Sequence, residues 1–131
     1  MTALLAAGVL SSFWLDWSAN HLLHPAWPPH ARFHGALLLF FLAGVSAAGI
    51  WLMWSAPSGV RAGVRTSALL ALSFWTPLFY IPYLLPSATW WAGAPGSEPR
   101  YGGWAIYPNL IVAGVFIAAA LAAFRLCRAE T

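Results

Sequence analysis

Four long apolar segments constrain this chain more than any other feature of its sequence. They cover about residues 2–23, 33–54, 66–85 and 104–124, and each has the roughly 20 apolar residues that a membrane-spanning helix needs. Only 7% of the 131 residues are charged, whereas 61% are hydrophobic. A soluble domain has about 25% charged residues. The sequence therefore predicts an all-α membrane protein: one domain, residues 1–131, with four transmembrane helices in an antiparallel bundle.

Prolines mark the connections between these segments. Pro25, Pro28 and Pro29 separate the first segment from the second, and a helix cannot continue through them. Pro29 is well placed as the first residue of the second helix, where no backbone donor is needed. Pro77 and Pro82 predict kinks within the third segment. The two connections on the side away from the termini are therefore expected to be proline-rich outer loops.

The arginines predict an orientation. Because cytoplasmic loops carry an excess of basic residues, the side with more arginines is assigned to the cytoplasm. Four arginines lie on the side of the termini and two on the other. The arginines are scattered and form no basic stripe, so no nucleic-acid partner is predicted. The prediction is an integral protein of a bacterial inner membrane with both termini cytoplasmic. The first group is Arg61, Arg65, Arg125 and Arg128, and the second is Arg32 and Arg100.

The ionisable residues gather in one short stretch. All four histidines lie between residues 21 and 34, and Asp16 lies just before them. An ionisable group at membrane depth is costly and tends to mark a functional site. Asp16, Asn20 and His24 share one helix face if the first helix extends that far. The candidate catalytic residues are Asp16, His30, His34 and Arg32, and the candidate ligand-binding residues are Asn20, His21, Trp27, Tyr80, Tyr83 and Asn109.

Three interpretations of this polar stretch stay open. In the first, Asp16 is an acid or base that burial and a nearby histidine tune. In the second, His30 and His34, one helical turn apart, bind a transition metal with His21 or His24, and Asp16 is a further candidate ligand. Haem would need only one or two of these histidines as axial ligands. In the third, the side chains only tie the loop to the helix ends, and Arg32 pairs with Asp16 or a lipid headgroup. Among the candidate site residues none is assigned as a metal ligand, and no cofactor is predicted.

A second group of polar residues lies on the third and fourth segments. Tyr80 and Tyr83 fall on one stripe of a regular helix, and Asn109 lies near the outer end of the fourth segment. Together with tryptophans, these residues would line an outer cavity suited to a flat lipophilic ligand with one polar group. Hydrogen bonding between helices is the alternative explanation.

The sequence around the histidines resembles that of a known group of proteins. Residues 16–34 read D-x3-NH-x3-P-x-WPPHARFH, which resembles the signature of a family of small, uncharacterised four-span membrane proteins. That resemblance implies that Asp16, His21, His30, Arg32 and His34 belong to one site.

A second resemblance is architectural. Four spans with an acid in the first, a broken hairpin, and prolines and tyrosines in the later spans are similar to the emopamil-binding-protein and sigma-two-receptor superfamily. Members bind sterol-like or amine ligands, and some isomerise double bonds by proton transfer. This chain departs from them because it lacks a clear second intramembrane acid.

The functional expectation combines these observations. It is a membrane-embedded enzyme or binding protein for a lipophilic small molecule or lipid, with isomerase or cyclase chemistry in which Asp16 is the acid or base. His30 or His34 would relay the proton, and Arg32 would hold a polar substrate group. The alternatives are a non-catalytic subunit of a larger membrane complex and a His-ligated metal- or haem-binding protein. Homo-oligomerisation is equally open.

Overall fold

The chain is mostly helical, with 73% of residues in helices. The computed structural model describes residues 1–55, 60–85, 88–91, 94 and 96–129, so parts of the predicted loops at 55–59 and 86–103 lie outside the described residues. The elements are α1 (Thr2–Asp16), α2 (Pro29–Ser55), α3 (Val60–Trp75), the 3₁₀ helix η2 (Thr76–Phe79), α4 (Ile81–Leu84), β1 (Arg100–Tyr101), β2 (Trp104–Ala105) and α5 (Pro108–Ala129).

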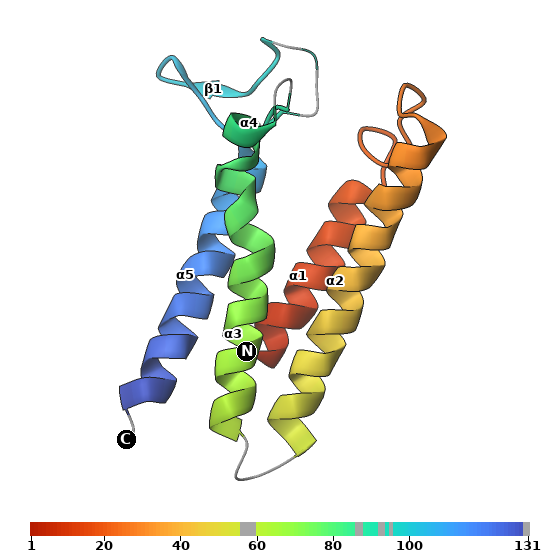
Figure 1. The fold of residues 1–131 in the computed structure, drawn as a ribbon. Coiled ribbons are helices and arrows are strands. Elements are labelled where there is room, and N and C mark those ends of the chain that lie inside the picture. The colour runs from red at the N-terminus through yellow and green to blue at the C-terminus, as the bar shows by residue number, and fades with distance from the viewer. Residues whose placement is uncertain (56–59, 86–87, 92–93, 95, 130–131) are drawn as a thin grey trace.

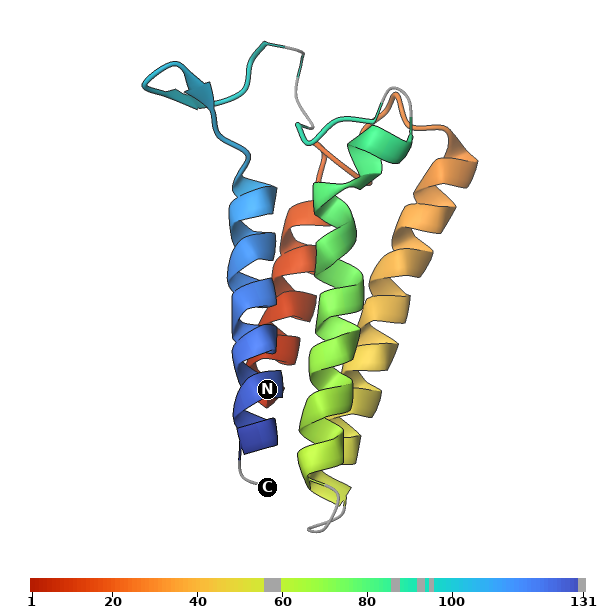
Figure 2. The ribbon, with the colours of Figure 1, turned by 60° about the vertical axis from the view of Figure 1, so that its left-hand side comes forward.

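Four helical rods make an antiparallel bundle (Figures 1 and 2). The third rod is α3 continued by η2 and α4. α1 and this third rod run toward the upper end of the figures, whereas α2 and α5 run toward the lower end, where both termini lie. α3 packs against α2 on one side and α5 on the other, and α1 packs against α2 and α5. The α1–α2 connection, α4 and the β1–β2 hairpin form the upper end (Figure 1).

α1 is shorter than the predicted span 2–23 and ends at Asp16. Trp17 leaves the helical conformation, with φ −82° and ψ 57°, and a series of turn hydrogen bonds then reverses the chain. The Asp16 carbonyl accepts the Leu22 N–H at 2.9 Å, and the Ser18 carbonyl accepts the His21 N–H at 3.1 Å. These bonds use backbone groups that a continuing helix would need. Residues 17–28 therefore form a compact connection at the upper end.

A glycine in α2 holds this connection in place. Leu22 is only 4% exposed and packs with Trp27 over Gly35. A Cβ at position 35 would lie 2.7 Å from Leu22 Cδ1 and 3.3 Å from Trp27 Cζ3, so a larger residue would push the connection outward. α2 begins at Pro29, the residue that the sequence favoured as the first of this helix, and so starts before the predicted apolar segment 33–54.

The third rod is broken where its prolines predict. α3 ends at Trp75, and Pro77 lies in the 3₁₀ turn η2 that follows. Pro82 lies in the first turn of the short helix α4, where its missing N–H is tolerated. The third rod starts at Val60, earlier than the predicted residue 66. The predicted apolar segment left out the charged residues Arg61 and Arg65, which lie in the first two turns of the helix.

The fourth span was predicted to start at residue 104, but α5 starts at Pro108. Trp104 lies instead in a small antiparallel hairpin, in which Tyr101 pairs with Trp104. Gly102 and Gly103 make the turn with φ of 57° and 87°, the left-handed region that a type I′ hairpin turn requires at both positions. The fold is mostly helical, as predicted, and this short hairpin lies in the connection before α5.

Small residues bring the rods close together. Ala68 and Ala71 of α3 and Ala113 and Ala120 of α5 are all buried, which lets the two backbones approach. Between Ala113 and Ala120, Phe116 of α5 stacks on Trp75 of α3, with ring centroids 4.5 Å apart.

A cavity inside the bundle has a volume of about 10 Å³. Gly8, Ser46, Trp75 and Phe116 line it, with apolar residues of all four rods. Since a water molecule needs a cavity of at least about 10–15 Å³, the space fits one water at most.

Within the part of the chain that the structure describes, two helices are long and apolar enough to cross a membrane. They are α2 over Pro29–Ser55, with a mean hydropathy of 2.2, and α5 over Pro108–Cys127, with 2.4. α1 is apolar but has only 15 residues, and the prolines divide the third rod into shorter helices.

Candidate functional site

The C-terminal end of α1 brings a carboxylate and an imidazole together. Asp16 Oδ1 lies 3.6 Å from His21 Nδ1, and the two side chains are 38% and 40% exposed. His21 Nδ1 itself is buried and makes no hydrogen bond. Within the part of the chain that the structure describes, this ring is the group that pairs with Asp16. A shift of a few tenths of an ångström would give a hydrogen bond through which a proton can pass.

Trp27 forms an aromatic wall beside this pair. Its ring centroid lies 5.1 Å from that of His21, with the planes tilted by 53°. Since Gly35 fixes the position of Trp27, the packing of the connection on α2 also orients His21. We refer to Asp16, His21 and Trp27 as the Asp16–His21 site. It is half-open, with one apolar side and one pair of groups able to exchange a proton.

Arg32 does not pair with Asp16, contrary to one of the predicted alternatives. Its guanidinium donates to the carbonyl oxygens of His24 at 2.9 Å and Pro25 at 3.2 Å. Both carbonyls belong to the bend of the α1–α2 connection. Arg32 therefore acts as a positioning residue that holds the connection on α2.

Asp16, Asn20 and His24 do not share a helix face, because the first helix does not extend to His24, as that prediction required, but ends at Asp16. Asn20 is exposed in the turn that follows. His24 Nδ1 accepts the Ala26 N–H at 3.2 Å, a local bond that shapes the loop.

His30 and His34 form a separate pair on the first turns of α2. Their Nε2 atoms are 3.0 Å apart and both side chains are exposed. Among the residues that the structure describes, no group of three or more His, Cys, Asp or Glu side chains lies close enough to hold a metal ion. The structure thus separates the predicted catalytic residues: Asp16 meets His21, while His30 and His34 meet each other.

The predicted residues of the later segments gather around Trp90. Asn109 Nδ2 donates to the Trp90 carbonyl at 3.0 Å, and Trp90 Nε1 donates to the Leu78 carbonyl at 2.7 Å. The Tyr83 ring lies edge-on to Trp90 with centroids 5.4 Å apart. Tyr80 is exposed. These contacts tie residues 88–91 to η2, α4 and α5.

We refer to Leu78, Tyr83, Trp90 and Asn109 as the Trp90 cluster. In the described ranges, no hydrogen bond, ion pair or ring contact joins this cluster to the Asp16–His21 site. The regular stripe predicted for Tyr80 and Tyr83 is interrupted by η2 and its turn. Sequence reasoning missed Trp90 as the centre of this cluster, because a tryptophan near a span end is equally typical of an interface belt.

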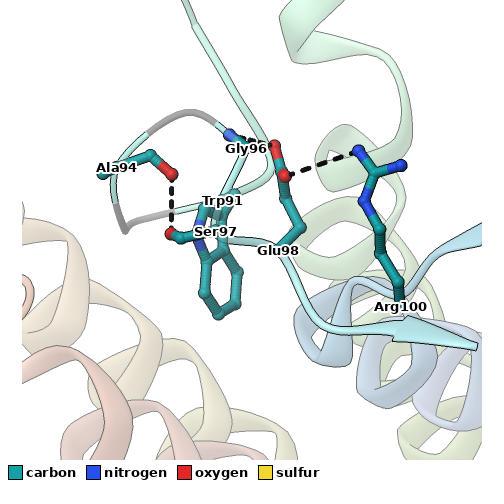
Figure 3. A network of polar contacts seen from close by, with 6 residues as sticks. All are labelled: Trp91, Ala94, Gly96, Ser97, Glu98 and Arg100. Atoms are coloured by element: carbon teal, nitrogen blue, oxygen red, sulfur yellow. Dashed lines mark hydrogen bonds and ion pairs between the residues drawn. The ribbon is translucent and has the colours of Figure 1, made fainter.

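The loop before β1 carries its own polar network (Figure 3). Ser97 Oγ donates to the Ala94 carbonyl at 2.6 Å and accepts the Trp91 indole N–H at 2.9 Å. Next to it, Glu98 Oε1 accepts the Gly96 N–H at 3.3 Å. The loop is thus closed by side-chain bonds to its own backbone.

The charge of Glu98 is stabilised within this loop. The backbone N–H groups of Glu98 and Gly96 hold the pKa of Glu98 below its usual value of 4.5, and the Arg100 guanidinium, 4.0 Å away, lowers it further. A carboxyl group whose pKa is lowered by folding stabilises the folded form above its unfolded pKa. The stabilisation disappears as the pH falls through the lower, folded pKa.

We therefore expect the loop to keep its conformation above pH 4.5 and to lose it at lower pH. The measurement is the amide proton shift of Gly96, followed by NMR from about pH 6 to about pH 3. This shift should titrate with a midpoint below 4.5 in the wild type and stay constant in Glu98→Gln. A midpoint above 4.5, or the same titration in Glu98→Gln, would contradict the assignment.

Comparisons with protein-family models, with curated proteins and with solved structures each gave no match. The two family resemblances seen in the sequence therefore stay predictions. The function of the chain has to be inferred from its own geometry.

Proposed function

We propose that the chain is an integral membrane protein that crosses the bilayer four times. α2 and α5 run in the same direction (Figure 2), so the chain between them must return across the same thickness. The third rod makes that return: α3 alone, with 16 residues, is about 24 Å long, and η2 and α4 extend it further. The apolar core of a bilayer is about 30 Å thick. α1, with 15 residues, is about 22 Å long, and the turn after Asp16 covers the rest of the distance across the bilayer.

The outer surface of the bundle supports this setting. Large apolar side chains of α2 and α5 point away from the other rods, and an exposed apolar surface of this extent is unusual in soluble monomers. Exposed tryptophans lie at both ends, typical of residues at a membrane interface. The lower end carries exposed arginines, which supports the proposal that this end faces the cytoplasm of a bacterial inner membrane. The exposed apolar residues include Phe33, Leu37, Phe40, Phe41, Ile111 and Val115.

Cysteine labelling tests this topology, because Cys127 is the one native cysteine. In spheroplasts, a membrane-impermeant maleimide should label Tyr101→Cys and Ser18→Cys in a Cys127→Ser background. Thr2→Cys, and Cys127 in the wild type, should react only after lysis. Labelling of positions 2 and 18 from the same side would remove α1 as a span, and labelling of Cys127 from outside would invert the orientation.

We infer that the Asp16–His21 site binds a lipophilic small molecule, removes a proton from one of its carbon atoms and adds a proton to another. The observation that carries this proposal is the 3.6 Å approach of a half-exposed carboxylate to an imidazole beside Trp27. A carboxylate next to an imidazole orients the ring and stabilises its protonated form, which suits general acid–base catalysis. Trp27 would contact the apolar body of the substrate.

The reaction class is an isomerisation or cyclisation. One proton leaves the substrate to Asp16 or His21 and another is returned at a different carbon, so no oxidant or reductant is needed. His21 takes the relay role that the sequence suggested for His30 or His34, because His21 is the ring beside Asp16. Asn20, exposed in the same turn, is available to a polar group of the substrate.

The test is proton exchange with solvent. Purified protein is incubated in heavy water with a total lipid extract of its host cells, and the extract is analysed by mass spectrometry. An active protein should add deuterium to one lipophilic compound. An extract in which no compound gains deuterium beyond the protein-free control would contradict the proposed chemistry.

A further inference from the structure

The exposed histidine pair on α2 has a geometry that the proposed function does not use. His30 Nε2 and His34 Nε2 are 3.0 Å apart, and their rings are nearly perpendicular, at 87°. The Phe33 ring lies parallel to that of His30, at 9°, and edge-on to that of His34. The outer nitrogens of two imidazoles thus lie within hydrogen-bonding distance of each other on the protein surface, with an aromatic ring beside them.

The nitrogen separation can be compared with the separations that different metal geometries require. With metal–nitrogen bonds of about 2.0–2.1 Å, a separation of 3.0 Å corresponds to an angle of about 91–97° at the metal. Adjacent ligands in square-planar and octahedral complexes subtend about 90°. A tetrahedral zinc ion would need nitrogens about 3.3–3.4 Å apart, and a linear two-coordinate ion about 4 Å. The pair fits the square-planar or tetragonal geometry that Cu²⁺ and Ni²⁺ prefer.

We propose that His30 and His34 form a surface site for an exchangeable divalent ion of the copper–nickel class, with Cu²⁺ bound most tightly. Copper binds nitrogen ligands most strongly among the divalent first-row metals. The two histidines supply two adjacent positions, and water or an external ligand fills the others, because the described residues place no third His, Cys, Asp or Glu in reach. The hydrogen bond between the two rings is replaced by the metal.

The site is compatible with its surroundings. Both histidines are exposed, so an ion reaches them without any movement of the bundle. The Arg32 guanidinium is directed to the carbonyls of His24 and Pro25. The proposal does not depend on the Asp16–His21 chemistry. It also differs from a resident metal cofactor, which the sequence does not predict and which would need more ligands.

The experiment titrates purified protein, without a histidine tag, with Cu²⁺ and follows the electron paramagnetic resonance of the bound ion. The wild type should bind one Cu²⁺ per chain with nitrogen ligands, at least about tenfold more tightly than His30→Ala or His34→Ala. His24→Ala is the matched control, because it removes a nearby histidine outside the pair, and it should bind like the wild type. The N-terminal amine is the same in every variant.

Two results would overturn the proposal. One is equal Cu²⁺ affinity in the wild type and in both pair variants, which would assign the copper to another group. The other is a loss of binding in His24→Ala equal to that in His34→Ala, which would mean that the ligands are not the pair. Circular dichroism of each variant checks that the helices are intact.

Discussion

Gly63→Ala should destabilise the bundle by about 2–3 kcal/mol, since overpacked sites cost this much and the neighbouring atoms here are backbone. A Cβ at position 63 would lie 2.9 Å from both the N and the Cα of Met53, and 3.0 Å from the carbonyl carbon of Leu52. Backbone atoms of a helix such as α2 cannot rotate away as a side chain can. α2 and α3 would have to separate along their shared length, losing contacts between the two helices.

The measurement is the unfolding free energy in detergent, with Gly44→Ala and Gly114→Ala as matched controls. Nothing lies within 4 Å of a Cβ at either control position. Both controls should therefore match the wild type or gain up to about 1 kcal/mol from the better helix propensity of alanine. A Gly63→Ala protein as stable as Gly44→Ala would show that α2 and α3 do not approach this closely.

Much of the fold was predictable because helices follow from long apolar segments and proline positions. α2 begins at the predicted Pro29, and the third rod breaks near Pro77. The end of α1 was not predictable, because apolar Leu22 continues the hydrophobic pattern beyond the turn. The helix ends because the Asp16 carbonyl bonds to the Leu22 N–H and Leu22 packs on Gly35. That packing joins Leu22 to Gly35, and no local sequence pattern indicates that these two residues are in contact.

The candidate site was predictable in its region but not in its pairings. The sequence places Asp16, His21, His30 and His34 in one short stretch, and spacing alone favours the one-turn pair His30–His34, which the structure contains. The pairing of Asp16 with His21 depends on the reversal of the chain after Trp17. Periodicity assumed a continuous helix there and so assigned Asp16 other neighbours.

Asp16→Asn should reduce proton exchange by at least about 100-fold, the usual contribution of a general acid or base. The amide is nearly the same size as the carboxyl group but cannot accept a proton. Because Asp16 is 38% exposed and its pairing with His21 is loose, the fold should survive. Arg32→Gln should not compensate for this change, since Arg32 bonds to the carbonyls of His24 and Pro25 instead.

The most direct test of the proposed proton transfer is the rate of deuterium incorporation from heavy water into the lipophilic compound, compared among four proteins. The wild type and Glu98→Gln, the same acid-to-amide change outside the site, should incorporate deuterium at the same rate. Asp16→Asn and His21→Gln should both fall toward the protein-free background while keeping the wild-type circular dichroism. Equal incorporation by the wild type and a folded Asp16→Asn would contradict the proposed role of the Asp16–His21 site.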